Sequence, residues 1–418
     1  MKKRLLLFVL MLVIAVSVYV LNQRAVLYVA PNGNDAATGT KLTPLRTLQK
    51  AADQATPGTT IWIRGGTYDE PLYVTTSDVH FKAYKQEAVY LDGRNAKSID
   101  GNKAMITIHN QQDVTIEGLT VQNVTTTSPN DTVMGMYISG TARNITLKNN
   151  HVRAIKTAGN GHGIAFYGTG AMKNIEVVHN VLEDLELGAS EALVLNGNIE
   201  HFTIANNTIR RSNNVGIDVI GYEGVAQTKH ADFVREGTIA NNMIYAISSY
   251  GNPAYGNEYS AGGIYVDGAK NITIAHNHIA HSDIGIEATS EHRGRNADNI
   301  RILHNEVRDN YYTGIAIGGY DAARGGTKNT IIAHNKLVNN DTKNLEGGQL
   351  LIQHHTQANR IDNNDFTASD SGLYIANVAR TNRDTIVKDN HFDAERGLWI
   401  WKKQEYGTLA AFNKAVND

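Results

Sequence analysis

The stretch Ile145-Thr-Leu-Lys-Asn-Asn150 decides the fold, because its pattern returns along most of the 418-residue chain. An apolar–x–apolar run is followed by two residues and then an Asn. The recurring Asn residues are Asn150, Asn180, Asn207, Asn242, Asn277, Asn305, Asn335, Asn364 and Asn390. Their mean period is 30 residues, with individual spacings from 26 to 35. Each run alternates apolar and polar side chains, which indicates a short strand with one buried face.

A second element, Gly followed by Ile or Leu, precedes most of these runs. It occurs at Gly163-Ile164, Gly216-Ile217, Gly263-Ile264, Gly285-Ile286, Gly314-Ile315 and Gly372-Leu373. Strands this short cannot hide an inner face alone, whereas stacked copies can. The sequence therefore predicts an all-β parallel solenoid in which the Asn side chains bond along the stack and take left-handed turn conformations. A propeller blade needs about 40–45 residues and a leucine-rich repeat needs Leu ladders, and neither matches.

The composition agrees with this fold and excludes several functions. The chain holds 43 Asn and 38 Gly but only 6 Pro, which is typical of many regular turns. Its 39 Lys+Arg against 41 Asp+Glu give a net charge of -2, so no global field attracts nucleic acid. The absence of Cys excludes disulfides, thiolate metal sites, a cysteine nucleophile and a lipoprotein anchor. We expect a monomer.

The first 24 residues read as a targeting segment. Met1-Lys2-Lys3-Arg4 is basic, and Leu5 to Leu21 is an uncharged apolar run. The run is long for a signal peptide and short of the roughly 20 residues of a spanning helix. We expect residues 1–24 to be a signal peptide or, preferably, an uncleaved signal anchor, and residues 25–418 to be one exported domain, secreted or held at the membrane only by this segment.

Both ends of the predicted solenoid carry capping signals. Thr43 as N-cap and Pro44 at the first helical position predict a helix over about 44–56, which covers coils over about 60–401. Leu398 to Trp401 reads as the last strand, with Trp399 and Trp401 in cap packing. A closing helix is expected over about 407–417. Open solenoid ends would expose unpaired strand edges, so such caps are needed.

The first coil also carries a characteristic set of Pro, Gly and aromatic residues. They are Tyr28-Val-Ala-Pro-Asn-Gly-Asn-Asp35, Gly39-Thr40, Pro44-Leu45, Leu48-Gln-Lys-Ala-Ala52, Pro57-Gly58 and Arg64-Gly-Gly-Thr-Tyr68. This opening resembles that of right-handed parallel β-helix enzymes of the pectate lyase superfamily, especially the family 9 polysaccharide lyases and right-handed β-helix repeat proteins. The resemblance implies action on a uronate-containing polysaccharide by β-elimination, epimerisation or hydrolysis.

The chain departs from that family at the residues that perform the chemistry. It has no cluster of closely spaced Asp such as those lyases use for Ca²⁺, so no cofactor or metal ligand is identified from the sequence, and Ca²⁺ stays open as a cofactor. The Asp-Pro-His signature of alginate epimerases and the paired Asp of polygalacturonases are absent too.

Coils 216–355 carry the richest outward polar residues. If each Ile of a Gly-Ile pair points inward, the next residue points out, which places Asp218, Tyr265 and Glu287 in one column. Adjacent strands lie about 4.8 Å apart, so Asp218 and Glu287 would be roughly 9–10 Å apart, with Asp267 on the same face. We predict that the catalytic residues are Asp218, Asp267, Glu287, His292 and Arg293. The predicted substrate-binding residues are Tyr222, Glu223, Tyr265, Glu291, Arg295, Tyr320, Asp321, Arg324 and His354. The alternative is an ordinary solvated face.

Two chemistries can use this set. Elimination needs a neutralised uronate carboxylate, which Arg293, Arg295 or Arg324 would supply, and a base, which would be His292 or Tyr265. Hydrolysis needs two carboxyl groups about 5–5.5 Å apart for retention or 6.5–9.5 Å apart for inversion. The resemblance favours elimination or epimerisation. An inverting glycoside hydrolase and a non-catalytic carbohydrate-binding or structural solenoid remain alternatives.

Three further expectations concern the carboxylates, the extent of the groove and the histidines of the turns. Crowded carboxylates should show a raised pKa or pair with Arg293 or Arg324. His162 and Glu191 carry less weight and would extend the groove. The histidines that precede ladder Asn residues are read as turn residues rather than as a metal column; they are His179, His276, His304 and His334.

Overall fold

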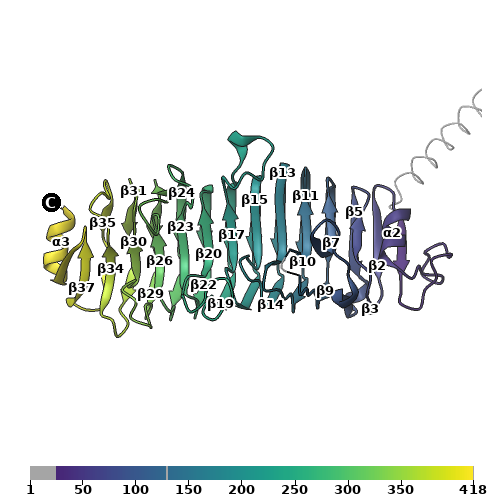
Figure 1. Cartoon of the computed structure of the whole chain (residues 1–418), viewed down its shortest axis with the longest axis horizontal. Coiled ribbons are helices and arrows are strands. Elements are labelled where there is room, and N and C mark those ends of the chain that lie inside the picture. The colour runs from purple at the N-terminus through teal and green to yellow at the C-terminus, as the bar shows by residue number, and fades with distance from the viewer. Residues whose placement is uncertain (1–24, 129, 418) are drawn as a thin grey trace, which may run out of the picture.

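The structure, a computed structural model, describes residues 25–128 and 130–417, whose strands stack coil upon coil into an elongated parallel β-helix (Figure 1). Successive coils pair in parallel along three faces, which confirms the predicted fold class. Residues 1–24, on which the expected targeting segment falls, lie outside the described residues. In the described part of the chain, no helix is long and apolar enough to cross a bilayer.

The first face carries the predicted site. Its strands are β4 (Leu72–Val74), β7 (Asn102–His109), β10 (Thr132–Ser139), the first parts of β13 (Asn160–Val178) and β15 (Leu193–Ala205), β17 (Ile217–Ile220), β20 (Gly262–Asp267), β23 (Ile284–Thr289), β26 (Thr313–Ile317), β30 (Leu350–Ile352), β34 (Leu373–Asn377) and β37 (Arg396–Trp401).

The second face follows in each coil and continues β13 and β15 around the corner. Its other strands are β1 (Val26–Val29), β2 (Thr59–Ile63), β5 (Val79–Ala83), β8 (Gln112–Glu117), β11 (Ala142–Lys148), β18 (Arg235–Ala240), β21 (Lys270–Ala275), β24 (Asn296–Leu303), β27 (Gly326–Lys328), β28 (Ile331–Ala333), β31 (Thr356–Gln357), β32 (Arg360–Asp362) and β35 (Ile386–Lys388).

The third face is a separate sheet of short strands. They are β3 (Gly66–Tyr68), β6 (Val89–Asp92), β9 (Leu119–Gln122), β12 (His151–Arg153), β14 (Val181–Leu185), β16 (Thr208–Ser212), β19 (Met243–Ile247), β22 (His278–Ala280), β25 (Glu306–Arg308), β29 (Lys336–Val338), β33 (Asp365–Thr367) and β36 (His391–Phe392).

The interior is a continuous column of aliphatic side chains. On the first face Ile217, Ile264 and Ile286 lie directly above one another and are fully buried, as the Gly-Ile pattern predicts. The preceding glycines are required by close packing at the corner. A Cβ on Gly216, Gly263 or any later Gly of this column up to residue 314 would lie within 2.8 Å of a carbonyl oxygen of the next coil.

The predicted asparagine ladder forms between the second and third faces. Asn277 is typical: its Nδ2 donates to Ile239 O at 2.9 Å and to Asn305 Oδ1 at 3.0 Å. Its Oδ1 accepts from both the backbone N and the Nδ2 of Asn242 at 2.9 Å. The same side-chain bond joins each ladder Asn to the next, from Asn150 to Asn390.

The ladder differs from the prediction in its backbone. The ladder Asn residues are not left-handed; the residue before each one is, with φ between 53° and 58°. These residues are Asn149, His179, Asn206, Asn241, His276, His304, His334, Asn363 and Asp389. The ladder side chain must point inward, so the turn falls on the outward residue before it. The predicted placement of the histidines in these turns is confirmed, and the rings of His276, His304 and His334 stack at 5.1 and 4.9 Å.

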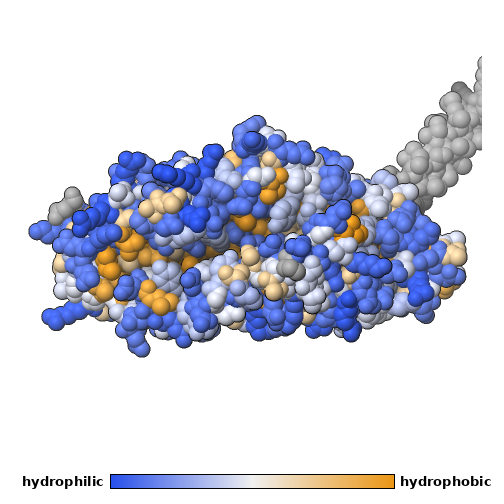
Figure 2. Space-filling model, in the orientation of Figure 1, coloured by the Kyte–Doolittle hydropathy of each residue, from blue (hydrophilic) through white to orange (hydrophobic). Residues whose placement is uncertain are grey.

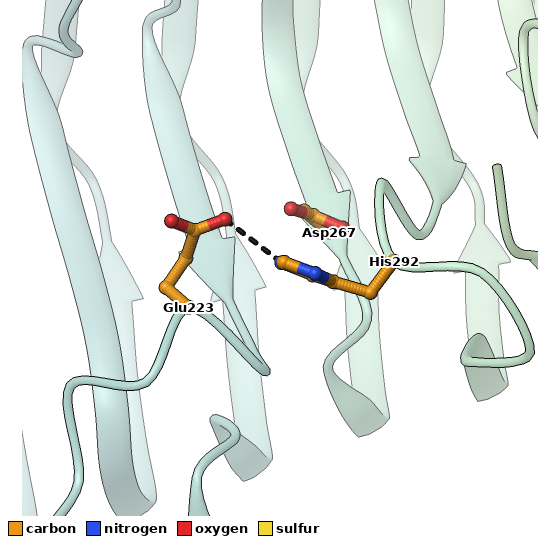
Figure 3. Close-up of side chains that lie close together, drawn as sticks. All are labelled: Glu223, Asp267 and His292. Carbon is orange, nitrogen blue, oxygen red and sulfur yellow. Dashed lines mark hydrogen bonds and ion pairs between the residues drawn. The ribbon is translucent and has the colours of Figure 1, made fainter.

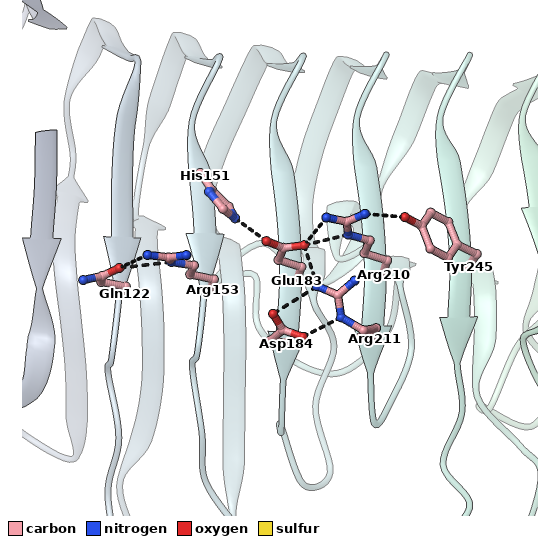
Figure 4. Close-up of polar contacts among 8 residues, drawn as sticks. All are labelled: Gln122, His151, Arg153, Glu183, Asp184, Arg210, Arg211 and Tyr245. Carbon is pink, nitrogen blue, oxygen red and sulfur yellow. Dashed lines mark hydrogen bonds and ion pairs between the residues drawn. The ribbon is translucent and has the colours of Figure 1, made fainter. Parts of the chain in front are cut away.

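The outer side of the third face shows how this chain pairs charges in a structural setting (Figure 4). Glu183 of β14 is buried, with His151 Nε2 at 2.8 Å, Arg210 Nε donating at 2.6 Å and Arg211 Nη2 donating at 2.7 Å. Although burial opposes it, these hydrogen bonds hold the pKa of Glu183 below its usual value. Arg210 and Arg211 therefore compensate the negative charge of this buried carboxylate.

The N-terminal cap is shorter than predicted. Helix α2 (Leu48–Gln54) begins after Thr47, whose Oγ1 accepts from Lys50 N at 3.2 Å. Thr43 and Pro44 are not its start, because Leu45 forms a parallel bridge with Val29 and is therefore extended.

The C-terminal cap contains one strand more than predicted. β38 (Gln404–Thr408) pairs antiparallel with β37 before α3 (Leu409–Asn417) begins. Trp399 and Trp401 are buried, and Phe412 of α3 stacks on Trp399 at 6.0 Å, which confirms their role in cap packing.

Replacing Asn277 by Leu should lower the free energy of unfolding by about 1–3 kcal/mol, because Asn242 and Ile239 would keep buried polar groups without partners. Chemical denaturation measures this loss. Thr203→Leu, at an exposed outward position, is the control and should change little. An Asn277→Leu protein as stable as the wild type would contradict a stabilising ladder.

Candidate active site

The column predicted from strand alternation is present on the first face. Asp218 of β17 pairs with Tyr265 of β20, and Tyr265 pairs with Glu287 of β23. Asp267 closes β20 two residues beyond Tyr265. The structure thus brings together the three carboxylates that the sequence singled out.

Elsewhere this outward column is mostly small or apolar. Before the carboxylates it continues through Thr107, Tyr137, Ala165 and Val194, and after them through Ala316, Leu351, Ala376 and Ile400. Figure 2 shows apolar residues gathered in a hollow along the molecule, bordered by hydrophilic residues. The carboxylates therefore interrupt an apolar floor near its middle.

The carboxylates are far more buried than outward strand residues were expected to be. Asp218 and Asp267 are each 3% exposed and Glu287 is 6% exposed. Tyrosines crowd around them: Tyr167, Tyr255 and Tyr312 all have a raised pKa, caused first by burial and then by nearby carboxylates of this site. The alternative of an ordinary solvated face is therefore wrong for these three positions.

Burial and mutual repulsion dominate the electrostatics. Burial raises the pKa of Glu287 to about 8, with Glu291 and Asp267 adding to the effect. Burial likewise raises the pKa of Asp218 well above its usual value, and the negative charges of Glu191 and Asp267 add to it. Within the described residues, Asp218 Oδ1 has no hydrogen-bond partner. Of the two expected outcomes for crowded carboxylates, the raised pKa is the one observed.

Of the predicted arginines, Arg295 and Arg324 contact tyrosines rather than the three carboxylates. Arg293 and Arg295 are exposed, and Arg295 lies 4.6 Å above the ring of Tyr222. Arg324 stacks on Tyr320 at 4.8 Å and its Nε lies 3.6 Å from Asp321. Within the described part of the chain no Lys or Arg forms an ion pair with Asp218, Asp267 or Glu287. The expected pairing with Arg293 or Arg324 is therefore not observed.

Two other predicted residues are tied to the carboxylates by hydrogen bonds. Glu291 N donates to Asp267 Oδ1 at 2.7 Å, and Tyr265 Oη donates to Glu291 Oε1 at 3.2 Å. His292 Nε2 lies 2.9 Å from Glu223 Oε1, and both lie beside Asp267 (Figure 3). Glu223, Asp267 and His292 are the described residues that could hold a metal ion.

His354, which follows β30, is half-buried. Partial burial lowers its pKa, and its charged neighbours are His355, Lys403 and Asp321 rather than the carboxylate column.

Sequence reasoning gave too little weight to Glu191. It is the strongest charged neighbour of Asp218, and its Oε2 lies 3.4 Å from Nδ1 of the buried His162. Tyr167 Oη lies 3.2 Å from the other ring nitrogen of His162. The sequence itself indicates that Glu191 is near Asp218. Glu191 comes three residues before Val194, and Val194 pairs with Asp218 on the neighbouring strand.

The relatives of this chain agree with its architecture. Two family descriptions match: "Pel9A-like, right handed beta helix region" over residues 27–181 and "Right handed beta helix region" over residues 262–414. The uncharacterized protein YwoF of Bacillus subtilis is 48% identical over 403 residues, which cover 94% of this chain and 86% of YwoF. The chain belongs to the YwoF family of right-handed β-helix proteins.

The chain is also similar, more distantly, to proteins whose names state an action on carbohydrates. The pectate lyase PEL9 of Emericella nidulans is 43% identical over 74 residues, covering 16% of this chain and 18% of PEL9. The A-module of mannuronan C-5 epimerase AlgE4 of Azotobacter vinelandii has a TM-score of 0.51 at 15% identity, over 82% of this chain and 89% of that module. The GH136 lacto-N-biosidase of Eubacterium ramulus has a TM-score of 0.54 at 13% identity, over 89% of this chain and 68% of that enzyme. The likenesses to these two structures concern the fold.

The raised pKa of Glu287 predicts a pH-dependent effect on stability. The folded protein holds this proton up to about pH 8, whereas the unfolded chain releases it near pH 4.5, so the stability present below pH 4.5 is lost as the pH rises through 8. Gln cannot lose a proton. Glu287→Gln should therefore be more stable than the wild type at pH 8.5, by up to a few kcal/mol, since a tenfold difference in proton affinity corresponds to about 1.4 kcal/mol.

Thermal unfolding at pH 4.5 and 8.5 measures the effect. The exposed Glu176 provides the matched variant, and Glu176→Gln should shift the midpoint equally at both values. If the difference between Glu287→Gln and the wild type is the same at both values of pH, the pKa of Glu287 is not raised.

Proposed function

We propose that this protein hydrolyses the glycosidic bonds of a polysaccharide with inversion, with Asp218 and Glu287 as its acid and base. The observation that carries the proposal is the position of these two carboxyl groups. Both are buried in one outward column, and a single strand, which bears Tyr265, lies between them. Likeness in fold to a lacto-N-biosidase and to an epimerase that acts on mannuronan supports a polysaccharide substrate.

The separation of the two groups suits inversion. Two strand spacings of about 4.8 Å amount to roughly 9.6 Å between the backbones that carry Asp218 and Glu287. Inverting glycosidases hold their carboxyl groups about 6.5–9.5 Å apart, so that a water molecule fits beside the sugar ring. Rotation about the side-chain bonds of Asp218 and Glu287 can bring their carboxyl groups into that range.

The protonation of the pair suits acid–base catalysis. Hydrolysis needs one carboxylic acid to protonate the leaving oxygen and one carboxylate to activate water. Burial and the neighbouring negative charges favour retention of a proton by the pair at neutral pH. The second group, once ionised, serves as base, and we assign the roles to the pair rather than to either residue.

Elimination, which the sequence favoured, fits these charges less well. A lyase or epimerase must neutralise the substrate carboxylate, and Arg295 and Arg324 stack on tyrosines instead. A uronate at Asp218 would also meet several carboxylates. The apolar floor on both sides favours sugars without a charge at the cleavage point.

Incubation with a panel of neutral and uronate-containing polysaccharides tests the reaction class. We expect reducing ends to appear without the ultraviolet absorbance of unsaturated ends. NMR of the first products should show inverted anomeric configuration. Unsaturated products would establish a lyase, and no reaction on any glycan would favour the binding solenoid.

On the active polysaccharide, Glu287→Gln and Asp218→Asn should each lower kcat by at least about 10²-fold, the lower end for a positioned acid or base. The variant that lacks the acid should recover activity on aryl glycosides, whose leaving groups need no protonation. Glu176→Gln, on the second face, should keep wild-type kcat. Full activity of Glu287→Gln combined with loss of activity in His162→Ala would move the centre to the earlier coils.

We also propose that residues 1–24 direct export and retain the protein at the outer face of the membrane, on the basis of the basic start and the apolar run. Cell fractionation tests this proposal. The full chain should sediment with membranes and be cleaved by external protease, whereas the chain without residues 1–24 should remain inside the cell. Export of the truncated chain would contradict the proposal.

A further inference from the structure

Three side chains meet beside the carboxylate column from three different coils. Glu223 comes from the loop after β17, Asp267 ends β20, and His292 comes from the loop after β23 (Figure 3). One ligand atom of each lies within 4.8 Å of those of the other two. The residues are far apart in the sequence, so the stacking of the coils creates the cluster.

Neighbouring groups hold each of the three in place. Gly221 N donates to the carbonyl oxygen of Asp267 at 2.7 Å, which ties the loop of Glu223 to the end of β20. Glu291 N donates to Asp267 Oδ1 at 2.7 Å and fixes the direction of that carboxylate. His292 N donates to Ser290 Oγ at 3.3 Å. Such supporting bonds orient ligands before a metal arrives.

The charges around the cluster call for a cation. Asp267 is 3% exposed and lies beside a second carboxylate, that of Glu223. On the neighbouring strand, the 3% exposed Asp218 has an Oδ1 without a hydrogen-bond partner among the described residues, and the charge of Asp267 acts on it. By contrast, the buried Glu183 of the third face is surrounded by Arg210, Arg211 and His151.

We propose that Glu223, Asp267 and His292 bind one divalent transition-metal ion, of the class of Zn²⁺ or Mn²⁺. An imidazole with two carboxylates is a mixed nitrogen–oxygen donor set, which suits these ions and not Ca²⁺, whose ligands are oxygens. Three protein ligands leave at least one position open for water or a sugar hydroxyl. The binding needs no substrate and is therefore independent of the proposed hydrolysis.

Titration of the EDTA-treated full chain, without a polyhistidine tag, with Zn²⁺ and with Mn²⁺ in a calorimeter tests the site. We expect one ion per chain and a higher midpoint of thermal unfolding. His292→Ala and Glu223→Gln should each weaken binding at least about 10-fold, the smallest loss found even for groups that only orient ligands. Both variants should unfold at the wild-type midpoint in EDTA, because Glu223 and His292 lie in loops.

Two histidine variants are matched controls. His278 lies 3.3 Å from Glu306 on the third face without a second carboxylate in reach within the described chain, so His278→Ala should bind like the wild type. His304→Ala removes the centre of the stacked histidines and should also bind normally. The proposal is overturned by the absence of saturable binding, by tighter binding of Ca²⁺ than of Zn²⁺ and Mn²⁺, or by binding that survives His292→Ala and Glu223→Gln but fails in His304→Ala.

Discussion

The hydrogen bonds between buried asparagines hold each coil in register with the next, and the rest of the molecule depends on that register. Asn277, for example, joins the coils on both sides of it, and its partners Asn242, Ile239 and Asn305 are buried as well. A slip of one residue would turn every strand inside out, which would expose Ile264 and bury Tyr265. The ladder therefore fixes which side chains form columns on the outer faces.

The candidate site is a consequence of those columns. Asp218, Tyr265 and Glu287 lie together because three coils place the same position on the same face, without a shared sequence motif. Carboxylates brought together in this way must share protons or bind a cation, because several buried charges without compensation would greatly destabilise the fold. We assign the proton to the pair Asp218 and Glu287 and the cation to the neighbouring Asp267. The retained proton and the bound cation each compensate part of the negative charge of the groove.

The fold and the alignment of the column could be predicted from the sequence, but the side chains that surround the column could not. Strand alternation was sufficient to align Asp218 with Glu287, because a strand has a period of two wherever it lies. The surroundings of these residues include side chains such as Tyr255, whose pKa is raised by burial and by the charges of Glu191 and Asp218, and which lies in a loop whose path no periodicity describes. The stacking of Arg295 on Tyr222 was hidden for the same reason. Thr43 was wrong as a helix cap, because the bridge of Leu45 to Val29 extends the chain beyond it.

The carboxyl groups of this groove are expected to retain a proton at neutral pH. Infrared difference spectroscopy of the EDTA-treated protein between about pH 6.5 and pH 10 measures this directly, because a protonated carboxyl group absorbs apart from a carboxylate. We expect a protonated carboxyl band at pH 6.5 that weakens as the pH rises through about 8 and is reduced in Glu287→Gln but not in Glu176→Gln. A spectrum without a protonated carboxyl band at pH 6.5 would show that these carboxyl groups are ionised at neutral pH.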